Sequence, residues 1–235
     1  MRLFSLQDQH VWKASALVML QKLYSQYLFP CLCDWALSSS ELEPLRNYCV
    51  RETHGRVLEI GFGTGLNLLH YPETVQEIHA VDNNPKMHAK AARRIAQTNI
   101  PICQYELEGK SLPMESESFD CVVSTFTLCS IASVQQAMSE IWRVLKPGGR
   151  FHFLEHGLSP DPKVASWQEF MNPFQNFIGD GCQLNRPIES IICSQRFIMK
   201  PVEHFYLKNM PRIVGCIYQG QALKIKDCWI GVFRV

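Results

Sequence analysis

Short apolar runs alternate with amphipathic stretches over residues 56–155, and this alternation is typical of an α/β protein. The apolar runs predict strands, and the stretches between them predict helices because their apolar residues recur at helical spacing. The expected strands lie near 56–60, 77–81, 102–106, 119–125 and 149–155, and the expected helices near 65–70, 85–98 and 133–145. Strands that alternate with helices pair in parallel, so the pattern predicts a Rossmann-like, mostly parallel sheet with helices on both faces.

The segments on either side of this alternation predict further elements. Two helices are expected before it, about 11–29 and 39–52, with Pro30 breaking the chain between them. A helix is expected over 161–177, and two extended stretches, about 196–207 and 212–223, predict a terminal antiparallel pair that brings the sheet to seven strands. We therefore expect one compact unit, with a helical cap or lid at 1–54, a core at 55–156, and an insertion with the terminal strands at 157–235.

The apolar stretch from Ala16 to Leu32 predicts an amphipathic helix rather than a membrane span. Gln21, Lys22 and Gln26 interrupt it, whereas a span needs about 20 mainly apolar residues. Three roles stay open for this helix: a cap packed on the domain, a lid over the substrate, and a surface in weak contact with a membrane or a partner. No uninterrupted apolar core follows the first ten residues, so no secretory signal is expected.

The composition of the chain indicates which kind of partner it binds and in which cellular compartment we expect it. The chain has 235 residues and 46% hydrophobic content, which suffices to bury a full core. A net charge of +1 without a long basic run argues against nucleic acid and favours a small or neutral molecule as partner. The ten cysteines are scattered along the chain rather than arrayed as a small disulfide framework, so we expect a cytoplasmic protein.

The segment from Val57 to Gly65 carries the clearest chemical signal. It is an apolar strand that runs into glycines at 61, 63 and 65, which allow a sharp turn and leave no side chain between the loop and a ligand. Asp82 ends the next apolar run, so it is expected beside this loop, where a carboxylate can accept both hydroxyls of a ribose. The arrangement predicts a nucleoside-containing cofactor.

Two such cofactors compete for this loop. A dinucleotide fingerprint places a third small residue where this chain has Leu66. Glu59, just before the loop, would repel a pyrophosphate but attract an ammonium group. These two residues favour S-adenosylmethionine, which has an ammonium and no phosphate, over a nicotinamide dinucleotide.

Further blocks follow in a familiar order. They are Glu108 to Pro113, Ser118 to Ser124, Lys146 to Arg150 and Phe151 to Glu155. With the glycine loop, these blocks make residues 55–156 resemble the class I S-adenosylmethionine-dependent methyltransferases, in the subgroup with a type 11 methyltransferase domain. The resemblance implies that residues 55–235 form such a domain.

The same resemblance assigns the cofactor-binding residues. It implies that Glu59 faces the methionine end of S-adenosylmethionine, that Asp82 binds the ribose, and that Glu108 and the Gly109 backbone contact the adenine. The other residues expected at the cofactor are Gly61, Phe62, Gly63, Gly65, Asn83, Ser124 and Thr125.

A narrower resemblance extends to about residue 190. Thr127 to Ser130, Leu154 to His156, and Ile178 to Cys182 are similar to segments of the methyltransferase-like proteins that include the human thiol methyltransferases. This resemblance suggests a thiol as the acceptor. Those membrane-bound relatives begin with a hydrophobic anchor, which is not expected here.

Two residues are candidates for removing a proton from the acceptor. His156 follows the fifth expected strand, and Asp180 lies in a Gly-Asp-Gly turn. Each also has a purely structural interpretation, as a histidine bonded to backbone or as a turn-forming aspartate. Cys129 and Cys182 are interpreted as small hydrophobes rather than as metal ligands, so no metal is expected.

The leading hypothesis is a methyltransferase that converts S-adenosylmethionine to S-adenosylhomocysteine while methylating a small, apolar acceptor, such as a thiol. Quinones and other oxygen or carbon acceptors stay open. Two further hypotheses come from other classes: a non-catalytic S-adenosylmethionine-binding module that regulates a partner, and a nicotinamide oxidoreductase.

Overall fold

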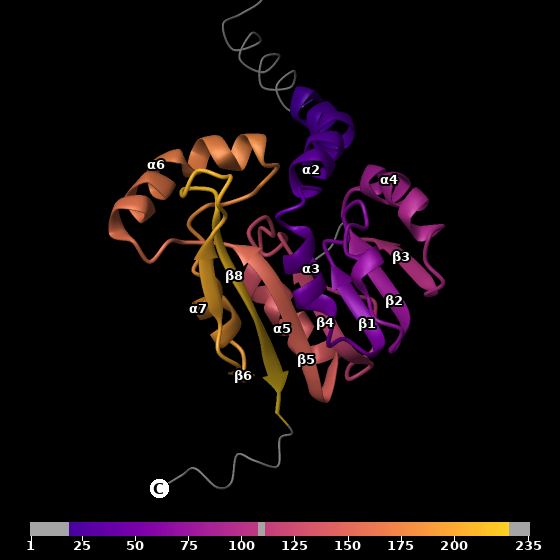
Figure 1. Ribbon diagram of the computed structural model, residues 1–235. Coiled ribbons are helices and arrows are strands. Elements are labelled where there is room, and N and C mark those ends of the chain that lie inside the picture. Colours follow the sequence, from indigo (N-terminus) through magenta and orange to yellow (C-terminus); the bar gives the residue numbers. More distant parts are fainter. Residues whose placement is uncertain (1–18, 108–110, 226–235) are drawn as a thin grey trace, which may run out of the picture.

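A single twisted sheet organises the molecule in the computed structural model, which describes residues 19–107 and 111–225 (Figure 1). Five strands are parallel: β1 (Gly55–Ile60), β2 (Val75–Asp82), β3 (Ile102–Glu106), β4 (Phe119–Thr125) and β5 (Leu145–His156). Three more are antiparallel to β5 or to one another: β6 (Phe197–Met199), β7 (Glu203–Tyr206) and β8 (Cys216–Lys224). The strand order is β3-β2-β1-β4-β5-β8-β6, with β7 paired to β8.

The predicted Rossmann-like fold is confirmed, with one more strand than expected. The sheet has eight strands in the described residues, because the stretch predicted as one strand over 196–207 divides into β6 and β7. Pro201 lies between the two, and proline cannot donate a hydrogen bond to a sheet ladder. Both short strands still pair with β8, as the predicted antiparallel terminus requires.

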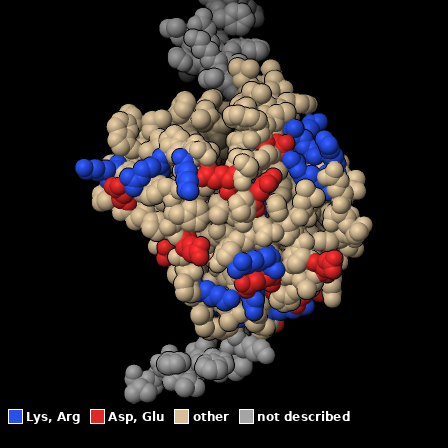
Figure 2. Space-filling model, in the orientation of Figure 1, with Lys and Arg blue, Asp and Glu red and all other residues tan. Residues whose placement is uncertain are grey.

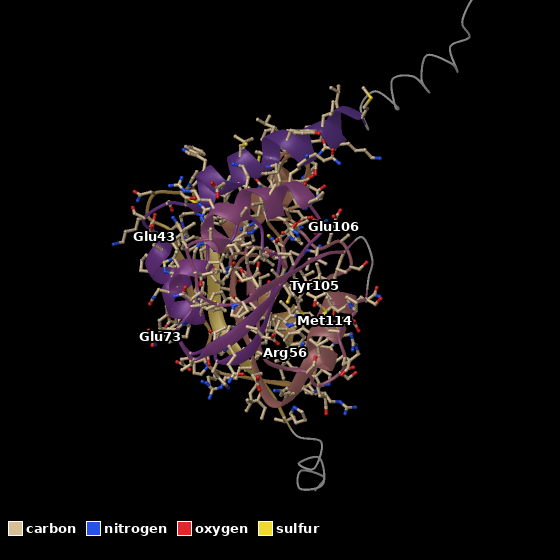
Figure 3. All side chains as sticks on the ribbon, turned by 90° about the vertical axis from the view of Figure 1, so that its right-hand side faces the viewer. Glu43, Arg56, Glu73, Tyr105, Glu106 and Met114 are labelled. Atoms are coloured by element: carbon tan, nitrogen blue, oxygen red, sulfur yellow. The ribbon has the colours of Figure 1, made fainter. Side chains whose placement is uncertain are left out.

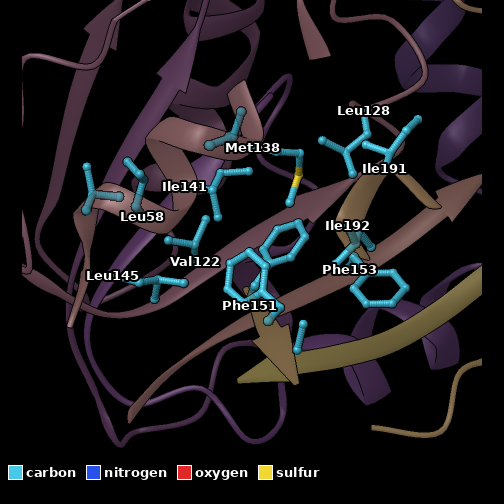
Figure 4. Close-up of a cluster of buried hydrophobic side chains, with 14 of the residues drawn as sticks. Leu58, Val122, Leu128, Met138, Ile141, Leu145, Phe151, Phe153, Ile191 and Ile192 are labelled. Carbon is cyan, nitrogen blue, oxygen red and sulfur yellow. The ribbon is translucent and has the colours of Figure 1, made fainter. Parts of the chain in front are cut away.

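Helices cover both faces of the sheet because its strands bury alternate residues on opposite sides. On one face α5 (Val134–Val144) and α7 (Ile188–Cys193) pack on a core that contains Leu58, Val122 and Phe151 (Figure 4). On the other face α3 (Glu43–Val50) and α4 (Pro85–Ile95) pack on Val57 and Val123. The short helix α7 was not predicted, and the helix expected near 65–70 is a single 3-10 turn, η2 (Leu68–His70).

The expected break at Pro30 is wrong. The chain is helical from residue 19 to residue 37, through a π-helical turn, η1 (Tyr24–Leu28), into α2 (Phe29–Leu37). Pro30 lies in the first turn of α2, where its missing N–H is not needed. The wider π turn just before it accommodates the proline ring without ending the helix. Residues 11–18 of the predicted helix lie outside the described residues.

The helical run 19–37 crosses the carboxyl ends of the strands and joins two parts of the molecule. Ser25 donates to the Asp180 carboxylate at 2.6 Å, beyond the end of α6 (Pro162–Ile178). The backbone carbonyl of Ser25 accepts from the Asn84 amide at 2.8 Å, and Asp34 pairs with Arg94 of α4 at 2.9 Å. These contacts place the run over the edge of the sheet where β1 and β2 end.

The carboxyl and amino ends of the parallel strands lie on opposite sides of the molecule. Figure 3 shows Glu106 at the upper, carboxyl end of the edge strand β3, and Arg56 at the lower, amino end of β1. Ligands of open α/β sheets bind beyond the carboxyl ends of the strands.

Within residues 19–107 and 111–225, no helix has the length and hydrophobicity that crossing a membrane requires.

Candidate active site

The glycine loop after β1 adopts a conformation that suits glycine. Gly61, Gly63 and Gly65 have φ values of 69°, 57° and 76°, in the left-handed region that other residues rarely adopt. A side chain at Gly61 would overlap that of Thr127, whereas one at Gly63 would have nothing closer than 3.8 Å. The loop backbone therefore packs against Thr127 on one side and is open to a ligand at Gly63.

Asp82 lies beside this loop at the end of β2, as predicted. Its Oδ2 accepts a hydrogen bond from the Gly63 N–H, and its Oδ1 accepts one from the Asn84 N–H, both at 2.8 Å. Burial raises the pKa of Asp82, although these backbone donors oppose the shift. A carboxylate oxygen has two lone pairs, so each oxygen of Asp82 can accept a ribose hydroxyl in addition to its backbone donor.

A cavity of about 700 Å³ opens over the loop at the carboxyl edge of the sheet. This volume is within the usual range of small-molecule sites, about 300–1,000 Å³. Its lining includes most of the predicted residues: Glu59, Gly61, Phe62, Gly63, Asp82, Asn83, Thr125 and Asp180. The structure therefore brings seven of the predicted cofactor residues and one predicted catalytic residue to a single cavity.

An acidic and a basic side chain, those of Glu59 and Arg46, are buried together in this lining. Glu59 accepts hydrogen bonds from Asn67 and from Tyr71, each at 2.7 Å. Arg46 of α3 donates to Asn67 at 2.9 Å and to Thr125 at 3.3 Å. Burial raises the pKa of Glu59 to about 7, against the hydrogen bonds and the charge of Arg46.

Arg46 has hydrogen-bonding capacity left over. Its Nε is buried and has no hydrogen-bond partner among the described residues. A buried donor without a partner is costly unless a ligand satisfies it. A carboxylate is the ligand that a guanidinium binds best.

The polar lining therefore fits the amino-acid end of S-adenosylmethionine. That end carries an ammonium and a carboxylate, which match Glu59 and Arg46 in charge. Asp82 fits the ribose, and the apolar side chains of Met87 and Leu107 line the cavity nearby. These residues would hold the cofactor.

Arg46, Asn67 and Tyr71 were missed from the sequence. Arg46 carried a usable signal, because it shares one helical face with the buried Leu42, Cys49 and Val50. A cation on an apolar helix face is unusual and indicates a buried partner. The other two residues follow the glycine loop at positions that no periodicity marks.

Several predicted residues do not reach the cavity. The Ser124 hydroxyl donates instead to the buried Glu155 at 2.6 Å, and Gly65 and His156 do not line the cavity. Glu108 and Gly109 lie outside the described residues. The predicted adenine contacts of these last two stay predictions.

The two predicted catalytic residues are in different environments. Asp180 is half-buried at a φ of 49°, lines the cavity, and accepts the hydrogen bond from Ser25. His156 is buried beside Cys182, whose Sγ is 3.8 Å from both ring nitrogens. The hydrogen bond with Cys129 and the imidazole of His156 lower the pKa of Cys182, in opposition to burial.

The chain is similar to known methyltransferases. A family model described as a methyltransferase domain matches residues 58–153. The thiol S-methyltransferase TMT1B of Rattus norvegicus is 37% identical over 136 residues, which cover 55% of this chain and 54% of that protein. The thiol S-methyltransferase TMT1A of Homo sapiens is 32% identical over 175 residues, which cover 72% of this chain and 70% of that protein. The match to the rat protein thus spans about half of that protein's length.

Solved structures share the fold at low sequence identity. The YcgJ protein of Bacillus subtilis superposes with a TM-score of 0.59 and 20% identity, covering 79% of this chain and 98% of that one. A geranyl diphosphate methyltransferase in complex with S-adenosylmethionine superposes with a TM-score of 0.60 and 12% identity, covering 78% and 84%.

Proposed function

This chain belongs to the class I S-adenosylmethionine-dependent methyltransferases, and we propose that it methylates a small, apolar thiol. The predicted family is confirmed, and with it the class of enzyme and the cofactor, S-adenosylmethionine. The thiol is supported by the similarity to thiol S-methyltransferases over 72% of this chain. Quinones and other oxygen or carbon acceptors are the alternatives to be tested.

The observation that carries the proposal is that Asp180 and several large apolar side chains line the same cavity. Phe29, Leu37, Phe126 and Ile131 line this cavity with Asp180. These apolar side chains suit an apolar acceptor, and the Asp180 carboxylate suits an acceptor with one mildly acidic proton. A thiol, with a pKa near 8.5, needs only modest assistance to lose its proton.

Each residue then has a defined task in the reaction. The cofactor supplies a methyl group that its sulfonium has already activated. Glu59 and Arg46 hold its amino-acid end, Asp82 holds its ribose, and the apolar wall excludes water from the acceptor. A carboxylate oxygen of Asp180 accepts the thiol proton, while the hydrogen bond from Ser25 fixes the orientation of this carboxylate. His156 does not line the cavity, so we assign it no proton transfer.

A panel of alkyl and aryl thiols, phenols and quinones tests the acceptor through formation of S-adenosylhomocysteine. We expect turnover with thiols and a fall in kcat of at least about tenfold in Asp180→Asn, with unchanged affinity for S-adenosylhomocysteine. Glu73→Gln, which removes an exposed carboxylate outside the cavity, serves as the control. Turnover with quinones alone would refute the thiol, and full activity of Asp180→Asn would refute the base. Tight cofactor binding without turnover of any acceptor would favour the regulatory module.

The exposed apolar surface of two helices supports a contact with lipid. Trp35 of α2 is 81% exposed and Phe170 of α6 is 74% exposed, and further large apolar side chains of both helices are exposed, among them Leu32, Trp167, Phe174 and Phe177. Figure 2 shows few charged side chains at this upper end of the molecule, where the helical run 19–37 lies. Aromatic side chains on helices of this kind insert at the surface of a bilayer. We therefore propose weak membrane contact here.

Sedimentation with phospholipid vesicles tests this contact. The double variant Trp167→Gln, Phe170→Gln removes two exposed aromatic residues of α6, and we expect it to reduce the vesicle-bound fraction. Leu69→Gln is the control, because Leu69 is 62% exposed on η2, outside both helices. Equal binding of all three proteins would contradict the proposal.

A reducing compartment is also proposed, in line with the cytoplasmic location expected from the sequence. It is supported by the cysteines in the described part of the chain, all nine of which are free thiols.

A further inference from the structure

Three side chains that bind soft metals meet beside the cavity. Cys129 follows β4, His156 ends β5, and Cys182 lies in the turn after α6. One ligand atom from each lies within 4.8 Å of the other two. The sulfurs of Cys129 and Cys182 are 3.5 Å apart, and the Cys182 sulfur is 3.8 Å from both nitrogens of His156.

Two of these three separations are close to the edges of a tetrahedral zinc site. Zinc binds thiolate sulfur at about 2.3 Å and imidazole nitrogen at about 2.0–2.1 Å, so two sulfurs are about 3.8 Å apart and a sulfur and a nitrogen about 3.5 Å apart. The Cys129–Cys182 and Cys182–His156 distances differ from these by about 0.3 Å, and the ligand atoms of Cys129 and His156 lie within 4.8 Å of each other. A disulfide would require the two sulfurs to approach to about 2.05 Å. Metal binding requires only that the imidazole turn one nitrogen toward the ion.

The backbone around the three residues is held in place. The Gln183 N–H donates to the Cys129 carbonyl at 3.0 Å, which ties the loop after β4 to the turn after α6. His156 lies in the β5–β8 ladder opposite Ile217. The Cys182 N–H donates to the Gly179 carbonyl at 3.1 Å. A metal site gains affinity when its ligands are positioned before the ion arrives.

The charges of the group suit a divalent cation. Two thiolates and a neutral imidazole balance two positive charges, so the ion and its three ligands are neutral together, which suits the burial of Cys129 and His156. Within the described residues, the ring nitrogens of His156 have hydrogen-bond contacts only with Cys182, and thiols are weak partners. A metal ion would satisfy the buried imidazole better.

We propose that Cys129, His156 and Cys182 bind one zinc ion, with a fourth ligand from outside this trio. Binding releases the thiol protons of the two cysteines to solvent and leaves His156 neutral. Ser130 and Asp180, which lie close to the ligands along the chain, line the cavity. The ion would thus brace the wall that carries Asp180. This proposal replaces the expectation of no metal and does not depend on the identity of the acceptor.

Metal binding by the full-length, reduced protein tests the site directly. The metal-free wild type is titrated with Co²⁺, which reports thiolate ligands through charge-transfer absorption in the near ultraviolet. We expect saturation at about one Co²⁺ per chain and displacement of Co²⁺ by Zn²⁺. A folded wild type that binds neither ion stoichiometrically would overturn the proposal, without recourse to any variant or to turnover.

Variants assign the ligands. Cys182→Ser and His156→Asn should each remove or strongly weaken the charge-transfer bands. Cys193→Ser, which changes an exposed cysteine outside the trio, should leave them intact. Circular dichroism checks the fold of each protein. Unchanged bands in folded Cys182→Ser would place the metal elsewhere, and a Cys129–Cys182 disulfide formed by mild oxidant in a chain that binds no metal would identify a redox dithiol instead.

Discussion

Affinity for the amino-acid end of the cofactor should fall as the pH falls through 7. Burial raises the pKa of Glu59 to about 7, so in the free protein this carboxyl group is mostly protonated below that pH. The cofactor's ammonium prefers the ionised carboxylate, so binding at low pH requires Glu59 to lose its proton first. This cost disappears at pH 8, where the group is already ionised.

The size of the effect follows from the fraction of ionised Glu59. With a pKa of about 7, the fraction falls from about 0.9 at pH 8 to about 0.1 at pH 6. The Kd for S-adenosylhomocysteine, which carries the same amino-acid end, should therefore rise about tenfold between these pH values. Isothermal titration calorimetry at pH 6, 7 and 8 measures this change. Glu59→Gln should bind more weakly at pH 8 and lose most of the pH dependence.

A second ligand separates Glu59 from other titrating groups. 5′-Methylthioadenosine keeps the nucleoside but lacks the ammonium and the carboxylate, so its Kd should change little between pH 6 and pH 8. Equal affinities of the folded wild type for S-adenosylhomocysteine at these two pH values would refute the role of Glu59. A full pH dependence in Glu59→Gln would assign the titration to another group, such as Asp82.

Three further changes have expected outcomes. Asp82→Asn should raise the Kd for S-adenosylhomocysteine by about 10- to 100-fold through lost charge-assisted hydrogen bonds to the ribose; an unchanged Kd in calorimetry would contradict the ribose assignment. Its Tm should also fall, because Asn has only one oxygen to accept from the Gly63 and Asn84 N–H groups. Gly61→Ala should lower the Tm more than Gly148→Ala. Both glycines have a positive φ, but only the methyl group added at Gly61 overlaps another side chain, that of Thr127. Equal Tm values of the two variants would argue against this packing. Phe151→Ala should reduce the free energy of unfolding in urea by about 3–5 kcal/mol, because the ring is fully buried; a loss below about 1 kcal/mol would show that the core collapses to fill the cavity.

The parallel part of the fold could be predicted because each of its elements is encoded locally. Apolar runs of strand length alternate with helical periodicity, and Gly61 and Asp82 mark the ends of two neighbouring strands. Their meeting follows from the rule that carboxyl ends of parallel strands share one edge. The error at Pro30 has a different origin, since a π-helical turn has no local sequence signal that competes with a proline.

The candidate site was predicted only in part, because much of it depends on contacts between distant segments. Arg46 reaches Thr125 from α3, and Ser124 turns away from the cavity toward Glu155 on the next strand. The partners of these two side chains lie on other elements, so spacing along the chain does not identify them. The grouping of Cys129 with Cys182 was equally hidden, because it depends on how the turn after α6 folds back against the loop after β4.

Ser25 forms hydrogen bonds on both sides of the site, to Asp180 and to Asn84. Its hydroxyl donates to Asp180, and its carbonyl accepts from the side chain of Asn84, whose backbone N–H donates to Asp82, the residue proposed to bind the ribose. A movement of the helical run 19–37 that admits an acceptor must therefore also disturb the anchoring of the nucleoside. We therefore expect binding of the acceptor and binding of the cofactor to be thermodynamically linked through Ser25.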